Sequence, residues 1–362
     1  MLKLTRPDAF FWEQYSTLWA NSPNPSPFQA PQLLRFFDGH PEVDTIAVQY
    51  FVDGELMAAA LFKKRKKQVQ FLSDLKTDHN FFVIDRRCTP EQTRDFFRQF
   101  LEKLKKEKWA LLLNNQPMWA PYMGLFLEEL QESSLFGEHL PYSVCPIVEA
   151  DSPEDLFERI NGSREFRYRV NRLKKQQDAV FEALTQDEDL ERWIDQFCDA
   201  HIRRWDGTPT PSAFLDPSRK DRFSGCLHAW QAQGILVRFS VRIGDQRVGF
   251  VVGLRQGNTL VHHNTTFDPD FKKFSPGIAL IHFMGEWMKE QQMHILDFGD
   301  GNETYKYSIA NKEHELSRIF ISDPSNLRFI LKTKMIKSVR NNSKLFDFYR
   351  DKIKPLTPRI WS

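Results

Sequence analysis

The sequence predicts an α/β (α+β) protein made of two similar modules, each a mixed, mostly antiparallel sheet flanked by helices. One order of elements, three strands followed by a helix and a further strand, occurs once in each half of the chain. In addition, 362 residues with 41% hydrophobic and 14% aromatic content suffice for two well-buried cores of ordinary domain size.

In the first half, the strand pattern begins at residue 45. Stretches rich in β-forming residues, joined by short turns such as Asp53-Gly54, predict three consecutive antiparallel strands. A helix follows, because Thr89-Pro90-Glu91-Gln92 has the form of a capping box. A short helix is expected earlier, at Pro31–Phe37, and another strand and helix complete the module. The stretches are TIAVQYFV, ELMAAALFK and QVQFLSD for the three strands, then WALLLNNQ and APYMGLFLEELQE.

The same order recurs in the second half. Three strands are expected around the turns Gly244-Asp245 and Gln256-Gly257-Asn258. A helix then begins with Ser275 where an N-cap belongs and Pro276 at the first helical position. A short strand ends the repeat. The stretches are ILVRFSVRI, RVGFVVGLR and TLVHHNTTF for the three strands, and HILDF for the last.

Between the two copies we expect a strand at Tyr142–Glu149, a helix from Ser152, and an amphipathic helix at Glu188–Trp205. The residues after 322 contain helical pieces and many lysines, and either packing on the core or loose surface binding fits them. The expected division is an N-terminal module (1–145), a C-terminal module (146–322) and a basic helical tail (323–362).

Charge, hydropathy and cysteine spacing argue against several classes of protein. Lys and Arg total 50 and Asp and Glu 48, so the formal net charge is only +2, whereas nucleic-acid-binding domains are usually more basic. No apolar run approaches the roughly 20 residues of a membrane span, and MLKLTRPDAFFWEQY lacks the apolar core of a signal peptide. The four cysteines form no C-x-x-C pair. We therefore expect a cytoplasmic chain with reduced thiols and no metal site.

The helix start near Ser275 is a candidate anion site. Lys272 and Lys273 precede it, the first amides of a helix are unpaired, and Gly277 allows a ligand to approach the backbone. An ordinary capped helix behind a solvated basic loop explains the same residues. The first module has the acidic start Thr-Pro-Glu, which would repel a phosphate, so only the second is expected to bind one.

The order strand, basic loop, helix, strand and tyrosine resembles the coenzyme A-binding half of GNAT acyltransferases. More narrowly, FDPDFKKFSPG, LDFGDG and ETYK are similar to the CelD-like branch, relatives of the FemAB aminoacyltransferases. The similarity covers residues 25–320. It implies tandem GNAT-like modules and acetyl-CoA or another acyl-CoA as co-substrate. The residues implied for the pyrophosphate are Lys272, Lys273, Ser275, Pro276, Gly277 and Ile278.

Acyl transfer to an amine requires an acid for the leaving thiolate and a base for the amine. The resemblance implies Tyr305 as the acid, and a tyrosine packed beneath the turn is the alternative. His262 and His263 are neighbours on a strand, so they face opposite sides and only one can serve the site. His263 is assigned as the base and His262 to substrate binding, although each could be a structural histidine. Relatives often carry aromatic or small residues here.

Asp297 and Lys306 complete the catalytic candidates. Asp297 follows two apolar residues, so a partly buried carboxylate is expected there, which either binds the amine or holds the following turn. Lys306 either contacts a substrate phosphate or acyl carbonyl, or forms a structural ion pair.

Substrate binding is assigned to two basic segments. The first is the stretch SREFRYRVNRLKKQQ, which is either a solvated helix surface or a basic wall that binds an anionic substrate. Arg167 is its candidate substrate-binding residue. HIRRWDG, which contains Arg204 and Trp205, is similar to a family pattern of histidine followed by arginine and tryptophan.

These features predict a GNAT-type N-acyltransferase that moves an acyl group, expected to be acetyl, from coenzyme A to an amine. The expected acceptor is an amino sugar or an envelope-polysaccharide precursor, and acyl carrier protein is an alternative donor. One rival is a FemAB-like transferase that uses aminoacyl-tRNA, although no coiled-coil heptad stretch supports it. The other is a non-catalytic GNAT-like scaffold, which the intact Ser-Pro-Gly loop and Tyr305 disfavour.

Overall fold

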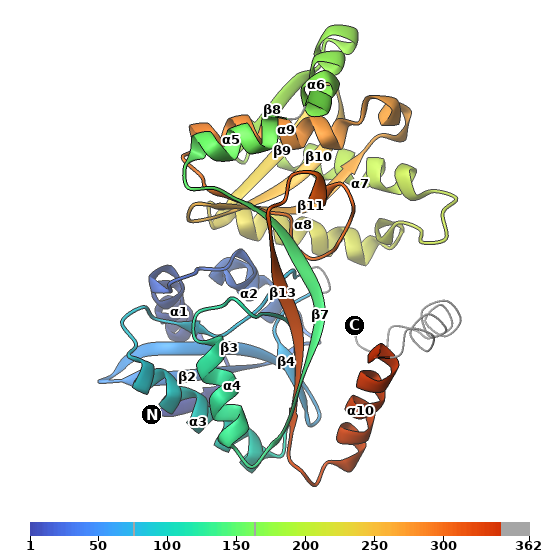
Figure 1. The fold of residues 1–362 in the computed structure, drawn as a ribbon. Coiled ribbons are helices and arrows are strands. Elements are labelled where there is room, and N and C mark those ends of the chain that lie inside the picture. Colours follow the sequence, from blue (N-terminus) through green and yellow to red (C-terminus); the bar gives the residue numbers. More distant parts are fainter. Residues whose placement is uncertain (75–76, 163, 342–362) are drawn as a thin grey trace. The chain divides into compact units, whose positions relative to one another are not determined.

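The computed structural model describes residues 1–74, 77–162 and 164–341. The chain divides into two compact units (Figure 1). Unit 1 comprises Met1–Ser143 and the chain from Glu315 onward, and unit 2 comprises Val144–His314. The sequence division had placed residues 315–322 in the second module, whereas the compact units group them with unit 1.

Unit 1 contains a mixed sheet with the strand order β1-β2-β3-β4-β6-β13-β7, and β5 pairs with β3. Strands β4 and β6 are parallel, whereas β6 and β13 are antiparallel. The strands are β1 (Leu2–Thr5), β2 (Asp44–Val52), β3 (Glu55–Arg65), β4 (Gln68–Phe71), β5 (Val83–Ile84), β6 (Ala110–Pro117), β7 (Phe136–Glu149) and β13 (Lys312–Ser322). The helices are α1 (Ala9–Asn21), η1 (Pro27–Gln29), α2 (Pro31–Asp38), α3 (Pro90–Glu107), α4 (Met123–Glu132) and α10 (Leu327–Asn341).

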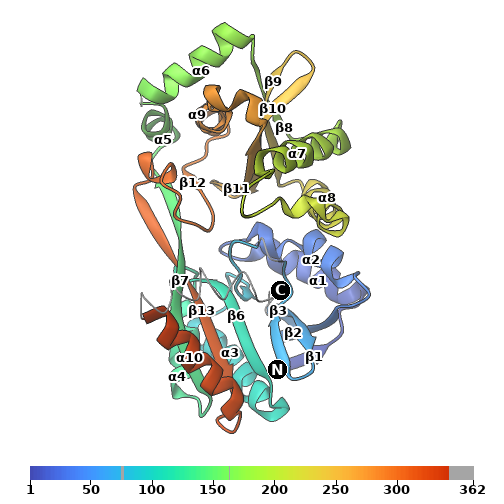
Figure 2. The ribbon, with the colours of Figure 1, turned by 90° about the vertical axis from the view of Figure 1, so that its right-hand side faces the viewer.

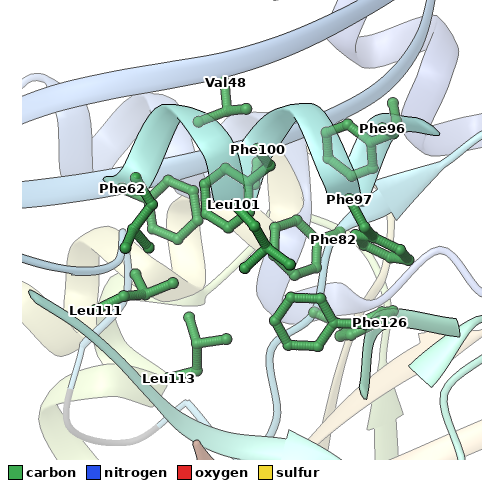
Figure 3. Packing of buried hydrophobic residues seen from close by; sticks show 14 of the residues in the cluster. Val48, Phe62, Phe82, Phe96, Phe97, Phe100, Leu101, Leu111, Leu113 and Phe126 are labelled. Carbon is green, nitrogen blue, oxygen red and sulfur yellow. The ribbon is translucent and has the colours of Figure 1, made fainter. Parts of the chain in front are cut away.

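The core of unit 1 is dominated by phenylalanine. Phe96, Phe97 and Phe100 of α3 lie against Phe82 and Phe126 (Figure 3). The ring centroids of Phe82 and Phe126 are 5.3 Å apart, and those of Phe82 and Phe100 are also 5.3 Å apart. Such pairs add about 0.5–1.5 kcal/mol each beyond the burial of their area. Contacts between phenylalanine rings therefore attach α3 and α4 to one face of the sheet.

Helix α10 packs on the other face of β6 and β13. The side chains of β6 alternate, so that Leu111 and Leu113 belong to the phenylalanine core and Leu112 contacts the cluster that includes Phe329 of α10. The part of the expected basic tail that the structure describes thus packs on the core. Residues 342–362 lie outside the described residues.

Unit 2 contains the strand order β7-β12-β11-β10-β9-β8. Strands β11 and β12 are parallel, and the other pairs are antiparallel. The strands are β8 (Val180–Leu184), β9 (Leu236–Ile243), β10 (Gln246–Gln256), β11 (Thr259–Phe267) and β12 (Ile295–Asp297). The helices are α5 (Pro153–Asn161), α6 (Arg164–Gln177), α7 (Leu190–Trp205), η2 (Ala213–Leu215), α8 (Pro217–Ala232), η3 (Pro269–Phe274), α9 (Pro276–Glu290) and η4 (Lys306–Ser308).

Helices cover both faces of the sheet in unit 2. Helices α5, α6 and α9 lie on one side and α7 and α8 on the other (Figure 2). The alternation along β9 agrees with this, because Phe239 belongs to the core beneath α9 whereas Ser240 accepts a hydrogen bond from Trp193 of α7 at 2.6 Å. Within the described residues, none of the helices combines the length and apolar character needed to cross a bilayer.

The two units share the order of elements that the sequence predicted, and they also share the way in which the strands pair. In unit 1, β2, β3 and β4 are followed by α3 and by β6, which is parallel to β4. In unit 2, β9, β10 and β11 are followed by α9 and by β12, which is parallel to β11. A strand from elsewhere in the chain then extends each sheet: β13 pairs with β6, and β7 pairs with β12. The predicted fold class is therefore confirmed.

Candidate active site

The centre of unit 2 is the point where β11 and β12 stop pairing. Their parallel ladder covers only Thr259–Val261 on β11, although β11 continues to Phe267 beside β10. The register of β10 with β11 shifts between Val252 and Gly253, which pair with Asn264 and His262 and leave His263 as a bulge. The far half of β11 thus has an edge that β12 does not cover.

Helix α9 begins at Pro276, as predicted, but the expected side-chain cap is absent. Ser275 has a left-handed backbone (φ 53°), and its hydroxyl accepts a hydrogen bond from Arg169 of α6. Its carbonyl accepts from the amides of Ile278 and Ala279 at 3.1 and 3.2 Å. Among the described residues, no acceptor meets the amide of Gly277. A Cβ at Gly277 would meet none of the neighbouring side chains within 4 Å, so the space beside this residue is open.

Four cationic side chains gather at this helix start. Lys272 and Lys273 are exposed on η3. Arg169 reaches Ser275, and Arg172 donates to the carbonyl of Lys273 at 3.2 Å. The structure thus brings the basic segment of α6 to the loop predicted to hold an anion. Arg169 and Arg172 were not among the predicted site residues, although their spacing of three positions places them on one helix face.

The short helix η3 is held firmly on its other side. Arg203 of α7 donates to Asp268 and to Asp270, each at 2.7 Å, and Gln246 of β10 donates to Asp268 at 2.9 Å. Asp268 also accepts from the amide of Asp270 at 3.0 Å. The guanidinium of Arg203 offsets one of these two negative charges, so that Arg203, Lys272 and Lys273 together leave this segment with a net positive charge.

Close packing sets the position of α9 on the sheet. A Cβ at Gly249 of β10 would lie 2.8 Å from Cβ of Pro276, so glycine is required for this approach. A Cβ at Gly253 would similarly lie 2.8 Å from the Phe239 ring. Gly249 lets the start of α9 rest directly on β10, and Gly253 makes room for the Phe239 ring.

Tyr305 lies just beyond β12, in the turn before η4. Its ring makes an edge contact with Phe298 at 6.1 Å between centroids. Burial raises the pKa of Tyr305 to about 12; the charge of Glu303 adds to this, whereas that of Arg204 opposes it. Among the described residues, no partner hydrogen-bonds to its hydroxyl. A half-buried, protonated phenol without a structural bond is suited to donating to a substrate atom.

Lys306 and Asp297 are both used by the turn itself. Lys306 is 3% exposed. Its Nζ donates to the carbonyls of Asp300 and Gly301 at 3.3 and 3.2 Å and pairs with Glu303 at 2.8 Å. Asp297 is 5% exposed and accepts from the amide of Gly299 at 2.8 Å. Asp297 therefore holds the turn that follows it, and Lys306 forms a structural ion pair. These are the structural roles that the sequence left open for the two residues.

The two histidines of β11 lie in different surroundings, as expected for strand neighbours. The His262 ring is 5.6 Å from Phe298, the residue that contacts Tyr305. The His263 ring makes an edge contact with Trp230 of α8 at 5.2 Å. Of the two, His262 is the one associated with the tyrosine.

The predicted substrate residues fall into two places. Arg204 lies near Tyr305 at the end of α7, with its guanidinium 4.3 Å from the Phe267 ring and 5.6 Å from the Trp205 ring. Burial lowers the pKa of Arg204, while the charge of Tyr305 opposes the shift. Arg167 is not brought to this cluster. It is exposed on α6 and donates to the carbonyl of Gly162 at 3.4 Å.

The corresponding helix of unit 1 begins differently. The predicted capping box of α3 is confirmed, because Thr89 Oγ1 accepts from the Gln92 amide at 3.2 Å and Gln92 Oε1 accepts from the Thr89 amide at 3.0 Å. Glu91 lies in the same first turn. This helix start thus has a side-chain cap, which α9 lacks, and carries a negative charge in its first turn.

Comparison with known proteins is consistent with this arrangement. Residues 161–307 match the family described as an acetyltransferase (GNAT) domain. The structure of FemX is 13% identical, with a TM-score of 0.63 over 91% of this chain and 99% of that chain. L-PGS from Bacillus licheniformis is 12% identical, with a TM-score of 0.59 over 91% and 98%. A tandem GNAT protein from the clavulanic acid biosynthesis pathway is 9% identical, with a TM-score of 0.51 over 90% and 100%.

A search of curated proteins found no match. At these identities the structural neighbours establish the fold alone. The tandem GNAT fold is thus confirmed.

Proposed function

We propose, from the premise that residues 161–307 form a GNAT-type N-acyltransferase domain, that α9 binds the pyrophosphate of an acyl-CoA. The observation that carries this proposal is the Gly277 amide, which has no acceptor among the described residues and belongs to a residue with open space in the direction of a Cβ. It lies at the positive end of the helix dipole, beside Lys272, Lys273, Arg169 and Arg172. Ser275 and Ile278 contribute the remaining backbone of the loop.

The acyl group then lies toward the uncovered edge of β11. The amine nitrogen attacks the thioester carbon, the carbon–sulfur bond breaks, and the electron pair leaves on sulfur. Tyr305 supplies the proton to this thiolate. Its pKa of about 12 keeps it protonated at neutral pH, and its hydroxyl has no competing bond within the described residues.

The amine must lose a proton to a base. We assign this role to His262 in preference to His263, because His262 lies beside Phe298, which also contacts Tyr305, whereas His263 packs on Trp230. Arg204 and Trp205 lie at the end of α7 and are proposed to line the acceptor side. Asp297 and Lys306 support the turn and take no step in this scheme.

The finer assignment is that of a CelD-like enzyme. In it the acyl group is acetyl and the acceptor is an amino sugar or envelope-polysaccharide precursor in the cytoplasm. This rests on the sequence resemblance of FDPDFKKFSPG and LDFGDG. An acyl carrier protein would present the same thioester to the same edge of β11.

A second candidate donor is aminoacyl-tRNA, which would make the protein a FemAB-like transferase. The observation that favours it is the basic helix α6, together with the similarity to FemX. Against it, the cations Arg169 and Arg172 of α6 point to the helix start that suits a compact pyrophosphate.

A thermal-shift panel of acetyl-CoA, longer acyl-CoAs and aminoacyl-tRNA tests the proposal, because a ligand that binds only the folded protein raises the melting temperature. We expect a saturable rise with acyl-CoA. A rise with aminoacyl-tRNA alone would move the assignment to the second candidate. No response to any donor, together with no transfer, would contradict both.

A further inference from the structure

A cavity of about 280 Å³ lies among α5, α6 and α9 of unit 2. None of the residues that line it surrounds Tyr305, and those on α9 belong to the second and third turns, past the N-terminal amides. Figure 1 shows the three helices side by side. The lining residues are Phe157, Glu158 and Asn161 of α5, Arg167, Val170, Asn171 and Lys174 of α6, and His282 and Glu286 of α9.

Two buried polar side chains line this cavity and leave hydrogen-bonding atoms without a partner among the described residues. Asn161 is 4% exposed, and within the described residues neither its Nδ2 nor its Oδ1 has a partner. His282 is 7% exposed, and its Nδ1 also has none there, because Glu286 stays 3.6 Å away. An unmet buried polar group costs about 1–3 kcal/mol, so a polar occupant is favoured.

The position of Asn161 is set by packing. It is the last residue of α5, which lies directly on α9 at Gly285. A Cβ at Gly285 would be 3.2 Å from Asn161 Nδ2 and 3.0 Å from Ile160 Cγ2. The amide is thus held against the helix, with one donor and one acceptor side by side.

The charges at the rim of the cavity are balanced. Arg167 and Lys174 are exposed cations of α6, and Glu158 and Glu286 are carboxylates of α5 and α9. Burial lowers the pKa of His282, with the charges of Lys174 and Arg167 in the same direction and that of Glu286 opposing it, so the imidazole adds no charge at neutral pH. A lone anion or a lone cation would meet two repulsive groups here, whereas a molecule carrying both charges matches the rim.

We propose that this cavity binds a free α-amino acid as its zwitterion. The ammonium and carboxylate of an α-amino acid flank one carbon atom, so the ammonium donates to Asn161 Oδ1 while the carboxylate accepts from Asn161 Nδ2. The ammonium is directed toward Glu158 and Glu286, and the carboxylate toward Arg167 and Lys174. The side chain of the ligand occupies the space beside Phe157 and Val170. This site is separate from the acyl-CoA site and does not depend on it.

The test uses the full chain without coenzyme A. Melting temperature and calorimetric heats are measured with L-alanine, L-leucine, L-lysine and L-glutamate. For each amino acid, the N-acetyl derivative, which lacks the ammonium, and the carboxamide, which lacks the carboxylate, serve as controls. We expect a saturable rise in melting temperature with at least one zwitterion. Each blocked derivative should bind roughly 10- to 100-fold more weakly, because it loses a charge-assisted hydrogen bond.

Three variants separate recognition from folding. Asn161→Leu keeps the size and removes both polar atoms, so binding should be lost. Lys174→Ala changes an exposed residue and should weaken binding even if Asn161→Leu fails to fold. Lys334→Ala, an exposed lysine of α10, is the matched control and should leave binding unchanged.

Three outcomes would overturn the proposal: no shift and no heat with any amino acid, equal binding of the blocked derivatives, or unchanged binding by Lys174→Ala and Asn161→Leu. Water would then satisfy Asn161 and His282. Coenzyme A affinity, measured in the same variants, reports on α9 alone, so its failure would count against the proposed function and not against this site.

Discussion

Arg169 donates a hydrogen bond to the hydroxyl of Ser275, the residue that precedes α9. Ser275 has a left-handed backbone and does not cap its own helix, as serine at this position usually does from an extended backbone. The Gly277 amide therefore stays open among the described residues. The Arg169 bond brings the cationic helix α6 to this loop and adds positive charge beside the uncapped helix start.

Gly277→Asp is expected to lower coenzyme A affinity by more than about tenfold without unfolding the protein, because the new carboxylate opposes the pyrophosphate in the first helical turn. An acidic residue in this turn favours the helix itself. Gly277→Ala is the matched control, since its Cβ enters open space and should leave affinity nearly unchanged. Calorimetry on both variants measures the effect, and wild-type affinity in Gly277→Asp would place the phosphate elsewhere.

One coenzyme A is expected per chain. At the start of α3, Thr89 caps the Gln92 amide and Glu91 places a carboxylate in the first turn, so a phosphate would meet a negative charge there. Calorimetric titration gives the stoichiometry directly. Two equivalent sites, or a ligand located beside Thr89, would contradict the assignment.

Tyr305→Phe is expected to lower turnover by about 10²–10⁴-fold while leaving coenzyme A affinity nearly unchanged, because it removes the acid and preserves the packing. Tyr307→Phe is the matched control: its exposed hydroxyl hydrogen-bonds to Glu313, so its loss should leave turnover intact. Steady-state kinetics with a direct binding measurement separates the two effects. Full turnover by Tyr305→Phe would return this residue to a packing role.

Lys306→Met is expected to destabilise the protein by about 1–3 kcal/mol, because two carbonyls and Glu303 lose a buried donor. Lys312→Met removes an exposed ion pair with Glu149 and should cost less than about 1 kcal/mol. Thermal unfolding of both variants checks the difference. Equal melting temperatures would mean that the turn does not rely on the Lys306 ammonium.

Local signals in the sequence were sufficient for several elements. The capping box at Thr89 and the helix start at Pro276 were predicted correctly, because each depends on residues within one turn. The repeated strand order was also visible, since short turns such as Asp53-Gly54 delimit each hairpin. The strands were shorter than expected at β4, which ends where its pairing with β3 ends, and at β12, which pairs with β11 and β7 over three residues.

Long-range relationships were not accessible in this way. The partner of Ser275 is 106 positions away, so no local pattern could indicate that its hydroxyl is already engaged. The bulge at His263 depends on the register with β10, which also decides which histidine lies near Phe298. The cavity around Asn161 requires three helices to meet, and no single stretch of sequence predicts it.

The pairing of β13 with β6 has a consequence for how the protein folds. Leu111 of β6 pairs with Ile321 of β13, two residues 210 positions apart in the chain, so this contact closes a very long loop. Non-local pairings of this kind slow folding, because loop entropy is lost before the contact forms. During synthesis, the β6–β13 ladder of unit 1 can form only after residues 316–321 have been made. Until then, the edge of β6 is open to pairing with other chains, and a fragment ending before residue 312 is expected to aggregate.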